Sequence, residues 1–336
     1  MSIRVVRELA EKEWLSFVNN HPSGNIFHTP EMFEVFRRTR GYQSELWSVV
    51  QNGRVVALFL PVKITLMNGM LKRLTTRSIV YGSILCESSA EGESGLDKLL
   101  QAYVRAARKE SLFTELRNLS DNNNLQPLLR RYGFVHENHL NYLIHLNRPE
   151  EELFRSIGNR TRKNIRHGLN QGRITIKEIK DREEVAACYD LLRRTYRAAH
   201  VPLADISLFE NAYDLLYPKG MAKFVLAYFD QMPVAVSVDL FYKDVVYGWY
   251  GGVSRAFGNQ PVHEILMWHV LKWASLNGFR VYDFGGAGKP GEKYGVRDFK
   301  SKFGGELVDY GRNRWVHTRW RLWLSEKGYQ LLRGRL

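Results

Sequence analysis

The sequence contains very little cysteine, with only Cys86 and Cys188 among its 336 residues. The two lie far apart, and neither belongs to a CxxC pair or has histidines at metal-ligand spacing. A disulfide scaffold and a zinc module are therefore excluded. Long apolar runs are also missing, since the longest candidate, Val55 to Val62, has only the length of a strand, and the first residues lack the apolar stretch of a signal peptide. We expect a soluble cytoplasmic protein, able at most to touch the inner face of a membrane.

Motifs that would name a reaction are scarce as well. The glycine-rich loop Gly285 to Gly291 resembles a phosphate-binding P-loop, but Asp283 stands where its first glycine is needed and Pro290 replaces the Mg²⁺-binding Ser or Thr. No GxSxG or HExxH motif occurs, and the ten histidines are scattered. We therefore expect no P-loop, no Ser/His/Asp triad and no metal site.

Positive charge is abundant, because 49 Lys and Arg oppose 35 Asp and Glu and leave a net charge of +14. This excess indicates an anionic partner: nucleic acid, a lipid surface or a phosphorylated metabolite. One acid-free basic stretch, Arg155 to Gly172, fits either a solvated helix face or a helix that faces phosphate. The second, Arg312 to Arg335, interleaves with tryptophans, which suits an anionic membrane or RNA. Trp320, Trp323 and Leu324 lie at helical spacing, so packing on the second domain fits them equally well.

The order of predicted elements repeats along the chain, and 44% hydrophobic residues are enough to form sizeable cores. In the first half we predict helices at 11–20 and 30–38, strands at 44–50, 54–65 and 79–86, then helix 96–109, strand 113–119, helix 125–132 and strand 134–146. The second half repeats this order, with helices at 185–199 and 207–217, strands at 223–229, 234–242 and 245–251, helix 262–277, strand 280–284, a short helix to 303 and a strand from 306.

The ends of the two halves also match, which supports the repeat. Gly133 and Gly304 each follow an aromatic residue where a short helix is predicted to end and a strand to begin. A length of 336 residues also suits about two domains. The simplest account is a mixed α/β protein made of two copies of one unit, residues 1–150 and 151–336.

One loop in the second copy matches a cofactor-binding pattern in part. N-acyltransferases of the GNAT superfamily carry Arg/Gln-x-x-Gly-x-Gly/Ala between a strand and a long helix, where backbone N–H groups hold the pyrophosphate of coenzyme A. Arg255 and Gly258 occupy two of these positions here, but Gln260 replaces the final small residue. Space for a pyrophosphate is therefore in question.

Several longer stretches together resemble the FemABX family of aminoacyltransferases. They are Asn25-Ile-Phe-His-Thr-Pro, the basic segment 160–168, Val246-Tyr-Gly-Trp-Tyr-Gly-Gly, and Tyr282-Asp-Phe-Gly-Gly followed by Gly295-Val-Arg-Asp-Phe-Lys-Ser-Lys-Phe-Gly-Gly. The resemblance implies two tandem GNAT-like acyltransferase domains. It also implies transfer of an aminoacyl group from aminoacyl-tRNA to an amine of a peptidoglycan precursor, with no tightly bound cofactor.

The resemblance also suggests site residues. Phe299 and Lys300 match a Phe-Lys pair near the reaction centre and the tRNA acceptor end, where a cation suits a phosphate or a developing oxyanion. The alternative is that Lys300 is an exposed lysine and that Phe299, with Phe303, buries one face of a helix turn. Tyr250 matches a tyrosine facing the precursor, whereas Tyr247, three residues earlier on the strand, is expected on the opposite face in the core.

Two further residues, Arg197 and His200, lie where relatives bind precursor phosphate or carboxylate. A carboxylate that relatives carry after Leu116-Arg117-Asn118 is missing, because Leu119 stands there. Asp283 is the alternative, as a base or as an acceptor for the amides of the glycine turn. The helical tRNA-binding arm of some relatives is also absent.

Three functions stay open at this point. The first is aminoacyl transfer from tRNA to a phosphorylated or lipid-linked cell-wall precursor. The second is acyl-CoA-dependent N-acylation in cell-surface polysaccharide or lipid synthesis, which Gly258→Pro should abolish. The third is a non-catalytic module that binds RNA or an anionic membrane. It predicts that Lys300→Ala is harmless while charge reversal at Arg162, Lys163 and Arg166 is not. Duplex DNA is not an expected partner.

Overall fold

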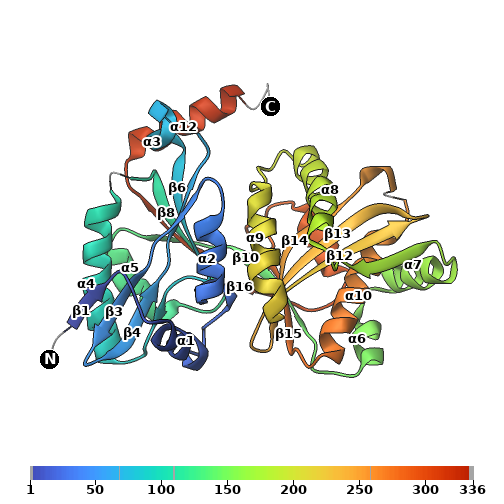
Figure 1. Ribbon diagram of the computed structural model, residues 1–336, viewed down its shortest axis with the longest axis horizontal. Coiled ribbons are helices and arrows are strands. Elements are labelled where there is room, and N and C mark those ends of the chain that lie inside the picture. Colours follow the sequence, from blue (N-terminus) through green and yellow to red (C-terminus); the bar gives the residue numbers. More distant parts are fainter. Residues whose placement is uncertain (1–2, 68, 109, 258, 333–336) are drawn as a thin grey trace. The chain divides into compact units, whose positions relative to one another are not determined.

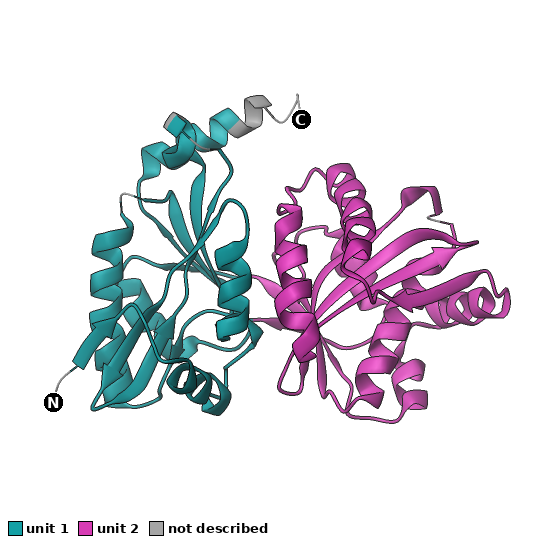
Figure 2. Ribbon diagram, viewed as in Figure 1, with its two compact units in different colours: residues 1–138, 310–336 teal, residues 139–309 magenta. Residues whose placement is uncertain are grey.

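A computed structural model describes residues 3–67, 69–108, 110–257 and 259–332 of the chain. The chain divides into two compact units (Figure 2): residues 1–138 with 310–336 form unit 1, and residues 139–309 form unit 2. Each unit combines helices with sheets that contain both parallel and antiparallel strand pairs. The predicted mixed α/β class is confirmed.

Unit 1 contains two sheets (Figure 1). The smaller has the order β1-β3-β4-β7, with bounds Ile3–Val6, Trp47–Gln51, Arg54–Phe59 and Leu85–Cys86. The larger has the order β2-β5-β6-β8-β17-β9, with bounds Tyr42–Ser44, Val62–Thr65, Thr76–Tyr81, Phe113–Arg117, Arg312–Val316 and Val135–Glu137. The α-helices of the unit are α1 (Glu11–Asn20), α2 (Pro30–Arg38), α3 (Lys72–Thr75), α4 (Ala90–Ala107), α5 (Gln126–Arg131) and α12 (Arg319–Leu332).

Local chemistry explains the first elements of unit 1. The helices α1 and α2 have the predicted bounds, and the Thr29 hydroxyl caps α2 by accepting from the Met32 N–H at 3.2 Å. Asn52 and Gly53 take positive φ values of 50° and 78°, which turn β3 into β4 as the predicted hairpin requires.

Unit 2 is built on one seven-stranded sheet. Its order is β11-β12-β13-β14-β15-β10-β16, with bounds Ile174–Glu178, Ala222–Phe229, Met232–Tyr242, Val245–Val253, Val281–Gly286, Leu140–His145 and Glu306–Asp309. The α-helices of the unit are α6 (Glu150–Ser156), α7 (Asn159–Asn170), α8 (Val185–Ala198), α9 (Ile206–Leu216), α10 (Val262–Leu276) and α11 (Gly295–Ser301).

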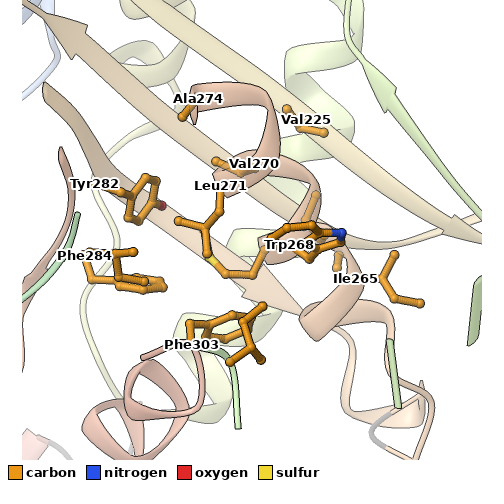
Figure 3. Close-up of a cluster of buried hydrophobic side chains, with 14 of the residues drawn as sticks. Val225, Ile265, Trp268, Val270, Leu271, Ala274, Tyr282, Phe284 and Phe303 are labelled. Atoms are coloured by element: carbon orange, nitrogen blue, oxygen red, sulfur yellow. The ribbon is translucent and has the colours of Figure 1, made fainter. Parts of the chain in front are cut away.

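The helix α10 forms the core of unit 2 on one face of the sheet (Figure 3). Ile265, Leu271 and Tyr282 belong to the same buried cluster there, together with Val225 of β12. The preceding residue of β12, Phe224, instead packs edge-to-face on Tyr213 of α9, at a centroid distance of 5.7 Å. Because successive strand residues alternate between faces, α9 covers the face opposite to α10. The sheet is therefore buried on both sides.

The two units exchange one strand of the repeat. β10 follows β9 in sequence but pairs with β15 and β16 of unit 2, whereas β17 follows β16 but pairs with β8 and β9 of unit 1. The predicted strand 134–146 is accordingly two strands, with Asn138 and His139 on either side of the boundary between units. The compact units therefore differ from the predicted segments 1–150 and 151–336. A division by chain order places β10 in the first segment and β17 in the second, whereas β10 pairs in unit 2 and β17 pairs in unit 1. A repeat boundary near residue 150 stays a prediction.

Candidate active site

A cavity of about 540 Å³ lies in unit 2, where two parallel strands part. β14 and β15 pair only at Val245 with Val281, Val246 with Tyr282 and Tyr247 with Asp283. Past this point β14 runs on to Val253 and β15 to Gly286, and both strands line the cavity. The volume is in the range of pockets for small ligands or for the reacting end of larger ones. An open strand pair therefore creates the site.

Tyr250 and Tyr247 both line this cavity, so the expected separation of the two onto opposite faces is wrong. The register of β13 against β14 shifts between Val238 and Asp239, which pair with Tyr250 and Gly248. Such a bulge adds one residue to β14 and resets the alternation of its side chains. Tyr250 is also held by an edge-to-face contact with Phe209 of α9, at a centroid distance of 4.8 Å.

Lys300 projects from α11 into the cavity wall and is buried, with 7% of its surface exposed. Its ammonium donates to the carbonyl oxygens of Phe284 at 2.6 Å, Gly286 at 2.8 Å and Gly285 at 3.3 Å. Burial lowers its pKa to about 8, although the nearby Asp283 carboxylate acts in the opposite direction. Lys300 is therefore no exposed lysine, and it holds a positive charge against the end of β15.

Gly285 allows the chain to present these carbonyls. Its φ of +68° is a left-handed conformation that suits glycine, and a Cβ there would lie 3.0 Å from the Tyr247 hydroxyl. Asp283 stabilises the same turn, because its Oδ1 accepts from the Gly285 N–H at 2.7 Å and its carboxylate receives the Asn141 side-chain amide at 3.4 Å. Burial raises the pKa of Asp283 to about 6. Its neighbours Tyr282 and Phe284 line the cavity and Asp283 does not, which matches the turn-stabilising alternative.

Phe299 lines the cavity and also packs in the core. Its ring stacks on His263 with centroids 4.0 Å apart and meets the buried Phe303 edge-to-face at 5.3 Å. His263 lies in the first turn of α10 and lines the cavity too. Burial, with a smaller contribution from Lys302, lowers the His263 pKa to about 4, so the imidazole is neutral at pH 7. Sequence reasoning missed His263, since it belongs to no motif.

A hydrogen-bonded carboxylate, Asp239, lies beneath the cavity. Ser237 donates to Asp239 Oδ2 at 2.7 Å, and the Tyr282 hydroxyl donates to Asp239 Oδ1 at 2.7 Å. Ser237 and Tyr282 line the cavity, whereas Asp239 is fully buried, which raises its pKa to about 6. At neutral pH the carboxylate is mostly ionised and able to accept a proton through Ser237. The sequence signal for this group was one acid within the apolar run 234–242, and sequence reasoning passed over it.

Three other predicted ligand-binding residues, Arg197, His200 and Arg255, lie outside the cavity lining. Arg197, in the last turn of α8, and His200, just after that helix, are exposed. Arg255 is exposed between β14 and α10, where its guanidinium donates to the Ala198 carbonyl at 2.8 Å. Gly258 lies outside the described residues. The roles of these four residues stay predictions.

The basic stretch 155–172 contains the last two residues of α6 and all of α7. Arg160, Lys163 and Arg166 are exposed, and the guanidinium of Arg166 lies 5.1 Å from the centroid of the Phe154 ring. An exposed cationic helix fits both the solvated and the phosphate-facing interpretation.

Neither a metal centre nor a membrane span is found in the part of the chain that the structure describes. No group of three or more His, Cys, Asp or Glu side chains there is placed to hold a metal ion. Likewise, none of the described helices has the length and apolar character that crossing a bilayer requires.

Comparison with known proteins shows similarity to acyltransferases. Residues 155–301 match a family model described as an acetyltransferase (GNAT) domain. The lipid II:glycine glycyltransferase of Staphylococcus haemolyticus (strain JCSC1435) is 23% identical over 247 residues, which is 69% of this chain and 57% of that protein. This chain thus spans little more than half the length of that curated relative.

Two solved structures show the same fold. The crystal structure of FemX superposes with a TM-score of 0.71 at 17% identity and covers 99% of this chain and 100% of that one. A tandem GNAT protein from the clavulanic acid biosynthesis pathway superposes with a TM-score of 0.60 at 11% identity, over 94% of this chain and 99% of that one. The tandem GNAT-like architecture is therefore confirmed.

Proposed function

Because this chain belongs to the FemABX family of tandem GNAT-like proteins, we propose that it is an acyltransferase acting on an amine of a peptidoglycan precursor. The donor is an aminoacyl-tRNA, and the reaction takes place in the cavity of unit 2. The observation that carries this proposal is the buried ammonium of Lys300, held by three carbonyl oxygens in the wall of a cavity formed by parted strands.

The chemistry is aminolysis of an ester. The amine nitrogen attacks the ester carbonyl carbon, an amide bond forms, the ester C–O bond breaks, and the freed oxygen ends as a hydroxyl of the donor. Negative charge develops on oxygen during this step, and a fixed cation stabilises it. Lys300 acts through its charge rather than as a hydrogen-bond donor, because its three N–H groups are engaged by carbonyls.

The amine must also lose a proton. Ser237 lines the cavity and donates to the Asp239 carboxylate, so its oxygen is able to take the amine proton while its own proton passes to Asp239. Aminolysis of an activated ester needs little more than a positioned, deprotonated amine. Ser237 and Asp239 thus supply the base that the sequence motifs lack.

The named relative acts on lipid II, and we extend this class of acceptor to the present chain. With a lipid-linked acceptor, the protein works in the cytoplasm at the inner face of the membrane, as a peripheral enzyme. The cations of α7 supply a surface for the phosphates of the tRNA donor.

Acyl-CoA is the alternative donor, and the GNAT family match over residues 155–301 is the observation that favours it. The loop at Arg255 lies between β14 and α10, where the GNAT pattern requires it. Arg255, however, already binds the Ala198 carbonyl, and Gln260 occupies the position of a small residue.

The test offers purified protein radiolabelled aminoacyl-tRNA or radiolabelled acetyl-CoA, each with lipid II as acceptor. We expect label to pass from aminoacyl-tRNA to the lipid, and Lys300→Met to remove this transfer. Transfer from acetyl-CoA alone would overturn the proposed donor but keep the acyltransferase. Transfer from neither donor would overturn both.

A further inference from the structure

Exposed apolar side chains gather at one end of unit 1. Fourteen large apolar side chains are exposed among the described residues. Six of them make up what we call the tryptophan patch: Leu66, Met67, Leu71, Trp320, Trp323 and Leu324. The remaining eight are spread over many other elements of the chain. A concentration of this kind marks a binding surface.

The patch is formed by a helix and the segment beside it. Trp320, Trp323 and Leu324 are three and four residues apart on α12, so they share one face of that helix. α12 contacts α3, which directly follows the segment that carries Leu66, Met67 and Leu71 (Figure 1). Trp320 and Trp323 keep 60% and 57% of their surfaces exposed, whereas Trp315, just before the helix, is buried in the core. Of the two alternatives for Trp320 and Trp323, their exposure favours a binding surface over packing on the second domain.

Cations surround the tryptophan patch. Residues 66–75 and 319–328 contain five basic side chains, Lys72, Arg73, Arg319, Arg321 and Lys327, and one acid, Glu326. Among the described residues, no ion pair joins any of the five to an acidic side chain. The Arg321 guanidinium lies 5.3 Å from the centroid of the Trp320 ring. Unpaired cations beside exposed tryptophans are the chemistry of a protein surface that enters the headgroup layer of an anionic bilayer.

We propose that the tryptophan patch docks the protein on an anionic lipid surface, with the indole rings in the headgroup layer and the cations against lipid phosphates. RNA is less favoured, because four of the six apolar side chains are aliphatic and offer no aromatic face on which a base would stack. A second copy of the chain is also less favoured, because pairing the patch with itself would bring like charges together. The inference deepens the proposed function, whose acceptor is lipid-linked, and is tested without that acceptor.

The experiment measures cosedimentation with vesicles of equal parts phosphatidylglycerol and phosphatidylcholine. We expect the wild-type protein to bind these vesicles, to bind much less at high salt, and to stay free with pure phosphatidylcholine. The double variant Trp320→Ser, Trp323→Ser should weaken binding by about tenfold or more. Both side chains are exposed, so the fold should persist, as circular dichroism will check. The matched control is Leu276→Ser, which removes a 67% exposed side chain from α10 and should leave binding unchanged.

Equal vesicle binding by the double variant and the wild type would overturn the docking surface. Loss of tRNA binding or of self-association in the double variant, with vesicle binding intact, would overturn it in favour of RNA or a second copy. An assay of transfer to a water-soluble precursor tests the proposed function independently of the docking surface. Transfer without vesicle binding contradicts the docking surface alone, and vesicle binding without transfer contradicts the proposed function alone.

Discussion

The two units contain the same parallel strand pair, but only one of the pairs opens. In unit 1, β6 and β8 pair from Ser78 with Thr114 to Tyr81 with Arg117, and the Gly82 N–H continues the ladder to the Arg117 carbonyl at 3.1 Å. In unit 2, pairing of β14 with β15 stops at Tyr247, six residues before β14 ends. The repeat therefore provides a common scaffold, and this strand pair forms a cavity only in the unit where the strands separate.

The interior beside the closed pair is filled. The Tyr103 hydroxyl lies 3.1 Å from Ser78 Oγ and 2.8 Å from Thr114 Oγ1, and Thr114 also meets His317 at 2.8 Å. A hollow of about 760 Å³ does occur in unit 1, but it is lined by α1 and the β3–β4 turn, away from β6 and β8.

Each unit also buries a lysine, in contrasting surroundings. Lys63 of β5 forms ion pairs with Glu45 and Glu110, so its charge is neutralised by carboxylates. Lys300 is bound by carbonyl oxygens instead. Lys223, which is also buried in unit 2, pairs with Glu178 as Lys63 pairs with its carboxylates. Lys300 differs from both, because carbonyl oxygens hold its ammonium in the wall of the cavity and Asp283 acts on it only as a nearby charge.

The largest effect is expected for Lys300→Met. Removing the cation should lower single-turnover aminoacyl transfer by about a hundredfold to a thousandfold, because the developing oxyanion loses its stabilising charge. The matched variant Lys63→Met removes the buried cation that pairs with Glu45 and Glu110 and should cost about 1–3 kcal/mol of unfolding free energy. Its transfer rate per folded molecule should stay within about twofold of wild type, since Lys63 does not line the cavity. Equal losses of transfer in both variants would contradict a specific role for the Lys300 charge.

Ser237→Ala is expected to have the next largest effect. It removes the hydroxyl that we propose to pass the amine proton to Asp239, so transfer should fall by about tenfold to a hundredfold. The control, Ser78→Ala in β6, deletes a hydroxyl contact with Tyr103 and should cost only about 1 kcal/mol of stability. The transfer rate at saturating substrate should therefore fall in Ser237→Ala and not in Ser78→Ala. Unchanged transfer in Ser237→Ala would rule out the proposed proton route.

A change of pH should have a smaller effect than the substitutions above. As the pH rises, Lys300 should contribute more to the stability of the fold and less to the transfer rate. Its pKa is about 8 in the folded protein against 10.5 for an ordinary lysine, so the unfolded chain binds more protons between these values. Wild type should gain stability relative to Lys300→Met as the pH rises from about 8 to 10.5. Over the same range its advantage in transfer rate should decline by about tenfold per pH unit, as the cation is lost. Denaturant titrations and short-time transfer assays measure the two trends, and a transfer advantage as large at pH 10 as at pH 8 would contradict the role of the charge.

The smallest effect is expected for Asp283→Asn. The amide oxygen still accepts the Gly285 N–H, so the turn should persist and transfer should fall by less than about threefold. Asp283→Ala removes that acceptor and should reduce transfer more strongly. If Asp283 were the general base, the asparagine variant would instead lose about a hundredfold or more in steady-state assays.

Much of the fold could be predicted because it depends on local patterns. The helices α1 and α2 follow apolar periodicity and caps, and the β3–β4 hairpin follows from Asn52-Gly53. The predicted strand 54–65 is instead β4 and β5, interrupted at Leu60 and Pro61. The exchange of β10 and β17 escaped prediction, since it depends on hydrogen bonds between strands far apart in the chain.

The candidate site was predictable in part. Motif resemblance led to Lys300, Phe299 and Tyr250, and all three line one cavity. The bulge that brings Tyr247 beside Tyr250 was not predictable, because strand alternation alone places them on opposite faces. His263 and Asp239 reach the site through α10 and β13, and only the packed structure reveals their proximity to it.

We propose that the acceptor binds at the open strand pair of unit 2, which hydrogen–deuterium exchange on addition of lipid II would reveal. We predict slower exchange in residues 247–253 and 284–286, with no change in residues 76–82 and 113–117. Protection confined to 76–82 and 113–117, or absent from both strand pairs while transfer proceeds, would contradict this location of the site.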